Sequence, residues 1–356
     1  MNDFVNRIVS GKATTYGKAT TSGKATTYGK ATTYGKATTY GKATTYGKNP
    51  HARFRKTQKK YRKMNCSPMV KNKTIFQNSC FTNKTLDVIK RAYNKHHPDN
   101  RIDQTSPQET WTALKDRLTK CDKEDCWLTE ISDSKVREKL DNYMFAPDHP
   151  PEWKKNYTEW LSNFDIFDVL HQYEETYPKF KFIGPTPIDF DTRPPKMNGK
   201  CVWQDLCEFS LSKQQSAGIT QIGVVFNLDK HDEDGSHWIS LFIDMKDAFV
   251  FFMDSAGEKP PSEVSDFVAR ITKQGRELSP PIHFEYHENH PMEHQLMNTE
   301  CGMYSLYFLI TMVTGQNELR KFSNYRDKIT FFKKRRIPDK YVNQFRKVFF
   351  NVPDKT

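Results

Sequence analysis

The segment between residues 237 and 254 reads HWISLFIDMKDAFVFFMD, and its β-branched and aromatic residues predict two short strands over 238–244 and 248–254. In an antiparallel hairpin the start of one strand faces the end of the other, so we expect His237 and Asp254 to be neighbours. A carboxylate there would hold the orientation and tautomer of the imidazole, as a general base requires. A purely structural histidine is the alternative.

A second block, HQLMNTECGMYSLYF at residues 294–308, leads into an apolar run that predicts a buried helix from Cys301 to about residue 315. A helix N-terminus favours the thiolate form of a cysteine, which is the nucleophile. Gly302 leaves room for a substrate to approach the sulfur, and the amide of Gln295 could stabilise an oxyanion together with the backbone N–H of Cys301. Taken alone, a cysteine before an apolar helix is more often an inert core residue, and its neighbours are what favour the nucleophile.

These blocks, with MDSAGEKPP at residues 253–261, resemble the active-site segments of the ubiquitin-like-protein (SUMO-specific) cysteine protease superfamily, which includes the adenovirus protease. Within it, the chain is most similar to the polyprotein-processing proteases of large DNA viruses, typified by the asfarvirus enzyme. The likeness extends to CDKEDCWLTE at residues 121–130 and to RIPDKYVNQFRKVF near the C-terminus. It covers most of residues 115–350.

The resemblance implies an α+β fold with a papain-like or adenain-like cysteine protease core. It also implies roles for four side chains as the base, its orienting acid, the oxyanion donor and the nucleophile, namely His237, Asp254, Gln295 and Cys301. Trp238 would wall a narrow tunnel and Gly302 would lie against the substrate. The tunnel admits glycine because glycine has no side chain to clash. No metal or organic cofactor is expected.

The expected function is that of a cysteine endopeptidase that cleaves after Gly-Gly-type sites and matures viral structural (capsid) polyproteins. Two alternatives stay open. One is a deconjugating protease for ubiquitin-like modifiers of the SUMO type, and the other is a catalytically inactive protease fold that serves as a binding or scaffold module. The partners implied are viral polyproteins or other Gly-Gly-containing proteins. By resemblance, we expect a monomer in the host cytoplasm (virus factory) and in the virion.

The basic residues of the 356-residue chain are concentrated at its start. The first 75 residues carry 17 Lys and Arg and one acid, a net charge of +16, whereas the whole chain carries +12, so the rest sums to −4. Residues 11–46 are six copies of GKATTY, one of them with serine in the last position. Because such sequence buries too little apolar surface to offset its ordering entropy, we expect residues 1–63 to be a disordered tail.

The tail ends in a polybasic segment, RFRKTQKKYRK at residues 53–63, in which seven cations alternate with Phe54 and Tyr61. This pattern is found in segments that bind nucleic acid, and a merely solvated linker is the alternative. The recurring Gly-Lys does not form a phosphate-binding loop, because the glycines are separated by five residues and alanine follows each repeat lysine.

Beyond the tail we predict a helical N-terminal segment, 64–180, and a catalytic domain, 181–356. Apolar spacing and capping signals place helices at about 85–95, 107–120 and 163–175, and a last helix at 338–350. Further strands are expected at 180–183, 221–228 and 282–287. Strands grouped between helices indicate an α+β arrangement.

The remaining features bear on metals, membranes and redox state. The chain has seven cysteines, an odd number, which favours reduced thiols over a disulfide scaffold. It has no long apolar segment and no signal-like start, which favours an intracellular protein without a membrane span. Four clustered histidines lack the spacing of a zinc site, and the loop DKHDEDGSH at 229–237 does not align with a calcium-binding loop. Its acids form either a solvated loop or a contact for a basic substrate segment.

Overall fold

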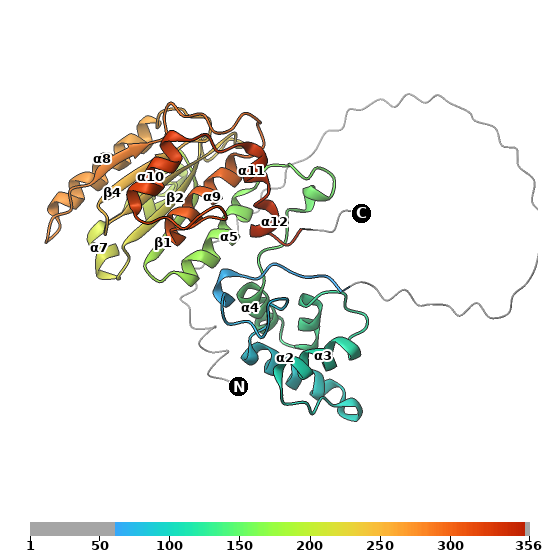
Figure 1. Ribbon diagram of the computed structural model, residues 1–356. Helices are drawn as coiled ribbons and strands as arrows, with labels where there is room; N and C mark the ends of the chain where they lie inside the picture. Colours follow the sequence, from blue (N-terminus) through green and yellow to red (C-terminus); the bar gives the residue numbers. More distant parts are fainter. Residues whose placement is uncertain (1–60, 353–356) are drawn as a thin grey trace, which may run out of the picture. The chain divides into compact units, whose positions relative to one another are not determined.

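The structure is a computed structural model that describes residues 61–352, and Arg62–Thr356 form one compact unit (Figure 1). The predicted GKATTY-repeat tail and most of the polybasic segment lie outside the described residues. Within the described part, no helix is both long enough and apolar enough to span a bilayer.

A five-stranded sheet forms the centre of the catalytic region, with its strands in sequence order. The strands are β1 (Phe180–Pro187), β2 (Gln221–Asn227), β3 (Trp238–Asp244), β4 (Phe249–Met253) and β5 (Glu285–Glu288). The inner pairs β2–β3 and β3–β4 are antiparallel, and the outer pairs β1–β2 and β4–β5 are parallel. The predicted strands all exist, although β1 is longer than expected and β5 begins three residues later.

The central strands are apolar on both faces because both faces of the sheet are covered. Alternate residues of β3 enter two different clusters: Phe242 packs with one, and Leu241 with the other. The Phe242 cluster includes α9 (Cys301–Thr314), α5 (Asn163–Thr176) and α10 (Tyr325–Lys334). The Leu241 cluster includes α8 (Ser262–Glu277). The predicted buried helix after Cys301 is therefore α9, in the interior on one side of the sheet.

The segment before the sheet is helical, as expected. It contains η1 (Pro68–Val70), α2 (Asn83–His96), η2 (Pro98–Asn100), α3 (Pro107–Arg117), η3 (Asp125–Glu130), α4 (Ser134–Met144), η4 (Pro151–Lys154) and α5. Side-chain oxygens cap the N-termini of its four α-helices, at Thr82, Ser106, Asp133 and Ser162. The predicted helices at 85–95, 107–120 and 163–175 correspond to α2, α3 and α5.

Several elements differ from the sequence prediction. The single helix expected over 338–350 is divided into α11 (Asp339–Asn343) and α12 (Arg346–Phe349). The prediction omitted α4, α8 and α10, and the short elements η5 (Pro195–Met197), α6 (Gln204–Cys207) and α7 (Leu211–Ser216). For α8 a signal was present, because Val264, Phe267 and Ile271 follow helical spacing and are buried.

Six of the seven cysteines are paired, as Cys66–Cys80, Cys121–Cys126 and Cys201–Cys207. The expectation of reduced thiols is therefore wrong for these six. The Cα atoms of the pairs lie 5.1, 5.5 and 6.3 Å apart, within the range that a disulfide spans. An odd number of cysteines does not show which of them lie close enough to pair, because one can stay free while the others form disulfides. The free cysteine is Cys301, and it is buried.

Candidate active site

His237, Asp254 and Cys301 meet where three elements begin or end. His237 directly precedes β3, Asp254 directly follows β4, and Cys301 is the first residue of α9. The imidazole Nε2 of His237 lies 2.7 Å from Oδ1 of Asp254, and Cys301 is the other side chain whose interaction raises the pKa of His237. Because Nε2 is engaged by Asp254, Nδ1 is the nitrogen available to the sulfur. The imidazole of His237 therefore lies beside the carboxylate of Asp254, as the predicted antiparallel hairpin indicated.

The surroundings of His237 favour its charged form. Burial by itself lowers the pKa of His237, but its hydrogen bonds to Asp254 and Cys301, and the negative charges of these two groups, raise that pKa to about 10. An imidazolium that persists at neutral pH can pair with a thiolate, and the N-terminal end of α9 adds a positive potential at the sulfur. The arrangement therefore suits a thiolate–imidazolium pair.

A buried asparagine that the sequence prediction missed holds Asp254 in place. The side chain of Asn289, just after β5, accepts a hydrogen bond from the backbone N–H of Asp254 at 2.9 Å and donates one to its carbonyl at 2.6 Å. The backbone N–H of Ala256 donates to the same carboxylate oxygen that contacts His237, at 2.9 Å. Hydrogen bonds to both the backbone and the side chain of Asp254 thus fix the position of its carboxylate.

Gln295 is a buried residue in the loop before α9, and Ser255 controls the orientation of its side chain. The Ser255 hydroxyl donates to Oε1 of Gln295 at 2.8 Å, and the Ser255 carbonyl accepts from the Gln295 backbone N–H, also at 2.8 Å. The Tyr304 hydroxyl, on the first turn of α9, lies 2.7 Å from the carbonyl of Ile337 and 3.2 Å from that of His294. The loop that carries Gln295 is therefore tied both to the residue after Asp254 and to the helix that begins with Cys301.

One side of the site is formed by Trp238, Gly302 and a residue from outside the expected blocks, Leu161. The indole Nε1 of Trp238 donates to the carbonyl of Leu161 at 3.0 Å. A Cβ atom added at Gly302 would lie 3.1 Å from Leu161 Cβ and 3.3 Å from Trp238 Cδ1. Only 2% of Cys301 is exposed, so the residue is almost fully covered by its neighbours. Leu161 lies in the segment before α5, 140 positions from Cys301, where no local pattern could reveal the contact.

The part of the chain that carries these side chains matches a known protein family. Residues 222–348 match the C-terminal catalytic domain of the Ulp1 protease family, and this range contains His237, Asp254, Gln295 and Cys301. Residues 222–348 belong to the Ulp1 protease family. The chain is therefore a cysteine protease, as the resemblance implied.

Two viral relatives extend the similarity of this chain beyond the matched domain. A relative from Acanthamoeba polyphaga mimivirus, which carries the name of a thiol protease, is 27% identical over 310 residues, or 82% of this chain and 94% of the relative. A cysteine protease of African swine fever virus is 26% identical over 204 residues, or 56% of this chain and 70% of the relative. The N-terminal helical segment is therefore part of what the mimivirus relative shares.

The crystal structure of a protease from African swine fever virus (ASFV) shares the fold of this chain. It matches 81% of this chain and 96% of its own, with a TM-score of 0.53 and 19% identity. The match confirms the expected α+β protease core with a helical N-terminal segment.

The clustered histidines do not form a metal site in the described part of the chain, which contains no group of three or more His, Cys, Asp or Glu that could hold an ion. His294 is buried with both ring nitrogens engaged: Nε2 contacts the carbonyl of Phe332 at 2.9 Å, and Nδ1 accepts from the N–H of Ile337 at 3.1 Å. Burial lowers the pKa of His294 to about 4, so the ring is neutral at pH 7. Its role is structural.

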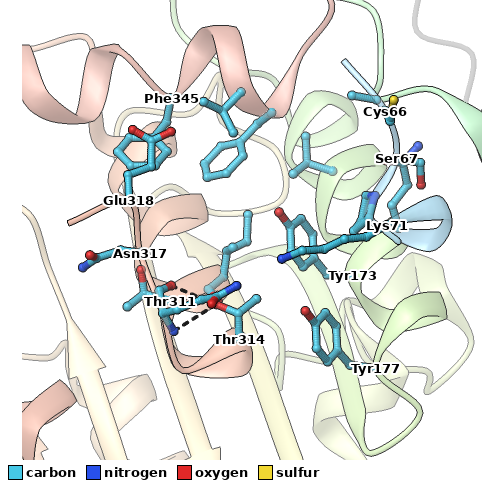
Figure 2. Close-up of a pocket in the computed structure, with 18 of the residues that line it drawn as sticks. Cys66, Ser67, Lys71, Tyr173, Tyr177, Thr311, Thr314, Asn317, Glu318 and Phe345 are labelled. Carbon is cyan, nitrogen blue, oxygen red and sulfur yellow. Dashed lines mark hydrogen bonds between the residues drawn. The ribbon is translucent and has the colours of Figure 1, made fainter. Parts of the chain in front are cut away.

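The protease also contains a cavity of about 550 Å³ away from the triad. Figure 2 shows Tyr173 of α5, Tyr177 directly after α5, and Thr311 and Thr314 of α9 directed toward it, with Lys71 on the side of the N-terminal segment. Neither His237, Asp254 nor Cys301 lines this cavity. It is therefore separate from the candidate active site.

Proposed function

We propose that this protease hydrolyses peptide bonds with Cys301 as the nucleophile, His237 as the general acid and base, and Asp254 as the group that orients His237. The observation that supports this assignment is the imidazole of His237, which is hydrogen-bonded to Asp254 and interacts with Cys301 at the start of α9. Each group has the position that its role requires.

The proposed reaction has two halves. The thiolate of Cys301 attacks the scissile carbonyl carbon, and the backbone N–H of Cys301 and Nε2 of Gln295 stabilise the oxyanion. His237 donates its proton to the leaving amine, which leaves a thioester on Cys301. Water then attacks the thioester while His237 accepts a proton from it, and the carboxyl product departs as the thiolate and the imidazolium are restored. Neither half requires a metal or an organic cofactor.

The proposed substrates are viral structural polyproteins that are cleaved after Gly-Gly-type sites. Leu161 and Trp238 lie close to Gly302, beside a cysteine that is almost fully covered, and such a passage favours residues without side chains before the scissile bond. The viral origin of the mimivirus and African swine fever virus relatives supports a role in virus assembly. The proposed place of action, the host cytoplasm and the virion, has the same support.

A second candidate substrate is a ubiquitin-like modifier. The Ulp1 family match supports it, as does a further relative from African swine fever virus, which carries the name of a SUMO-1 cysteine protease. Such modifiers also present Gly-Gly at the cleaved bond. The chemistry at Cys301 is identical in the two cases, so only a direct comparison of substrates distinguishes them.

The test uses the full-length chain and its Cys301→Ala variant with two recombinant substrates. One is a pair of folded reporter proteins joined by a flexible linker that contains Gly-Gly-Ala, with a Val-Val-Ala linker as its matched control. The other is SUMO fused through its C-terminal Gly-Gly to one of the reporters. Cleavage of the Gly-Gly-Ala linker alone, abolished by Cys301→Ala, is the expected result.

The other outcomes contradict the proposal in different ways. Cleavage of the SUMO fusion alone would show that the protease removes ubiquitin-like modifiers and would contradict the proposed processing of polyproteins. If neither substrate is cut, the binding or scaffold role becomes the better description. Equal cleavage of the Gly-Gly-Ala and Val-Val-Ala linkers would show that Trp238 and Leu161 do not impose the proposed restriction.

A further inference from the structure

The residue before Cys301 carries a buried carboxylate. Glu300 is the N-cap of α9, yet its side chain makes no capping hydrogen bond. It pairs with Arg346 of α12, whose Nη2 lies 2.9 Å and whose Nε lies 3.2 Å from the same carboxylate oxygen. Only 1% of Glu300 and none of Arg346 is exposed, so water does not screen this pair. Asn343 donates to the second carboxylate oxygen at 2.9 Å.

The Arg346 guanidinium also connects the segments around the nucleophile. It donates to the carbonyl of Glu159 at 3.0 Å and to that of Thr299 at 3.2 Å, and it lies 4.4 Å from the ring centroid of Trp153. Two residues beyond Glu159, Leu161 contacts Gly302 and Trp238. One side chain therefore links the C-terminal helices, the loop before Cys301 and the wall of the substrate passage.

The charge at Glu300 raises an electrostatic problem for the nucleophile. A carboxylate at the N-terminus of α9, adjacent to Cys301, opposes formation of a second negative charge on the sulfur. His237, paired with Asp254, supplies positive charge from the hairpin side. On the other side Glu300 faces Arg346, and the uncharged phenols Tyr157 and Tyr304 also interact with Glu300. Arg346 is the cation in direct contact with Glu300.

We propose that Arg346 is a positioning residue for the hydrolytic reaction: by neutralising Glu300 and holding the Leu161 segment, it allows Cys301 to ionise beside His237. The inference rests on the proposed role of Cys301 as the nucleophile. It assigns a function in the reaction to a residue near the C-terminus that contacts no reacting atom. The C-terminal helices are then required for the reactivity of the sulfur as well as for the fold.

The test measures alkylation of Cys301 by iodoacetamide across a range of pH, with the disulfides intact and Cys301→Ser as the blank. Because Cys301 is the free cysteine, the reaction reports its ionisation without any substrate. We expect Arg346→Gln to move the midpoint of the alkylation profile upward by about one pH unit, as an uncompensated neighbouring charge does. The double variant Glu300→Gln/Arg346→Gln should return toward the wild-type midpoint.

Arg270→Gln is the matched control. Arg270 also forms an ion pair (with Asp191 at 3.0 Å), donates to a carbonyl (of Leu206 at 2.8 Å) and lies over an aromatic ring (of Phe267 at 5.1 Å). It should leave the midpoint unchanged.

An unchanged midpoint in a folded Arg346→Gln variant, or an equal upward shift in the double variant, would overturn the proposal. Glu300→Gln covers the case in which Arg346→Gln does not fold, because it keeps the guanidinium and removes the opposing charge. Its midpoint should fall below that of the wild type, and no shift would again overturn the proposal. Failure to cleave the linker or SUMO substrate would contradict the proposed function without affecting this measurement.

Discussion

The hydroxyl of Ser255 donates a hydrogen bond of 2.8 Å to Oε1 of Gln295, and this contact determines which end of the amide is free. With Oε1 engaged, Nε2 remains as the donor for an oxyanion. Only 2% of Ser255 is exposed, so a water molecule does not readily replace the hydroxyl. Ser255 directly follows Asp254, so the short segment after β4 both contacts His237 and orients Gln295.

Ser255→Ala is expected to lower kcat by about tenfold with little change in KM, because a hydrogen bond contributes about 1 kcal/mol and its loss releases the Gln295 amide. Gln295→Ala, which removes the donor itself, should lower kcat by about 100-fold or more. Ser240→Ala is the control, because the Ser240 hydroxyl on β3 is buried without a hydrogen-bond partner. Wild-type kcat in Ser255→Ala would contradict the orienting role.

Asp254→Asn should move the alkaline limit of activity to lower pH. In the folded enzyme the pKa of His237 is raised to about 10, so its imidazolium persists well above the ordinary value of 6.5. Asparagine removes the negative charge of Asp254, and its neutral amide oxygen is a weaker acceptor for the imidazolium, so the lowering of this pKa by burial is less fully opposed. The measurement is kcat/KM against pH, and an alkaline limb that stays near pH 10 in the variant would show that Asp254 does not set the pKa.

The same raised pKa has a consequence for stability. Protonated His237 stabilises the folded state fully below its unfolded pKa of about 6.5, and this contribution is lost as the pH rises through about 10. The difference in free energy of unfolding between the wild type and His237→Ala should therefore be largest below pH 6.5 and should shrink toward pH 10. Urea unfolding at several pH values measures it, and a difference that grows with pH would contradict this assignment.

Gly302→Ala should lower kcat/KM by about tenfold or more, because the new methyl group would crowd Leu161 and Trp238 at 3.1 and 3.3 Å and displace the wall of the passage. The cost in stability should be about 1 kcal/mol. Gly223→Ala on β2 is a steric control, since its methyl group would lie 3.0 Å from the ring of Phe180. It should lower stability comparably and leave kcat/KM unchanged. Equal losses of kcat/KM in the two variants would exclude a specific role for Gly302.

The disulfides can be tested directly by counting thiols. The denatured, unreduced protein should titrate with one thiol, that of Cys301, and the reduced protein with seven. Replacing Cys66 and Cys80 together by serine should lower the free energy of unfolding by about 3 kcal/mol, because the bridge closes a loop of 14 positions. Peptide cleavage by the folded variant should be retained. Seven thiols before reduction would show that the pairs do not form in solution.

Local pattern was sufficient for much of the fold. The apolar residues of 238–244 specify a strand buried on both faces, and the apolar run after Cys301 specifies a central helix. His237, Asp254 and Cys301 could be selected because each stands at the boundary of such an element. By contrast, the break between α11 and α12 was not predictable, because the apolar spacing of 338–350 is compatible with one continuous helix.

The amino-acid sequence by itself determined the positions of the strands along the chain, the buried helix and the identity of the group of side chains that carries the proposed chemistry, since these depend on residue periodicity and on element boundaries. Tertiary structure alone decided what surrounds that group. Leu161, Asn289 and Arg346 come from distant parts of the chain, and their contacts with Gly302, Asp254 and Glu300 arise only when the helices pack on the sheet. No local pattern encodes such pairs, because hydrogen bonds and steric contacts depend on distance in space and not on separation along the chain.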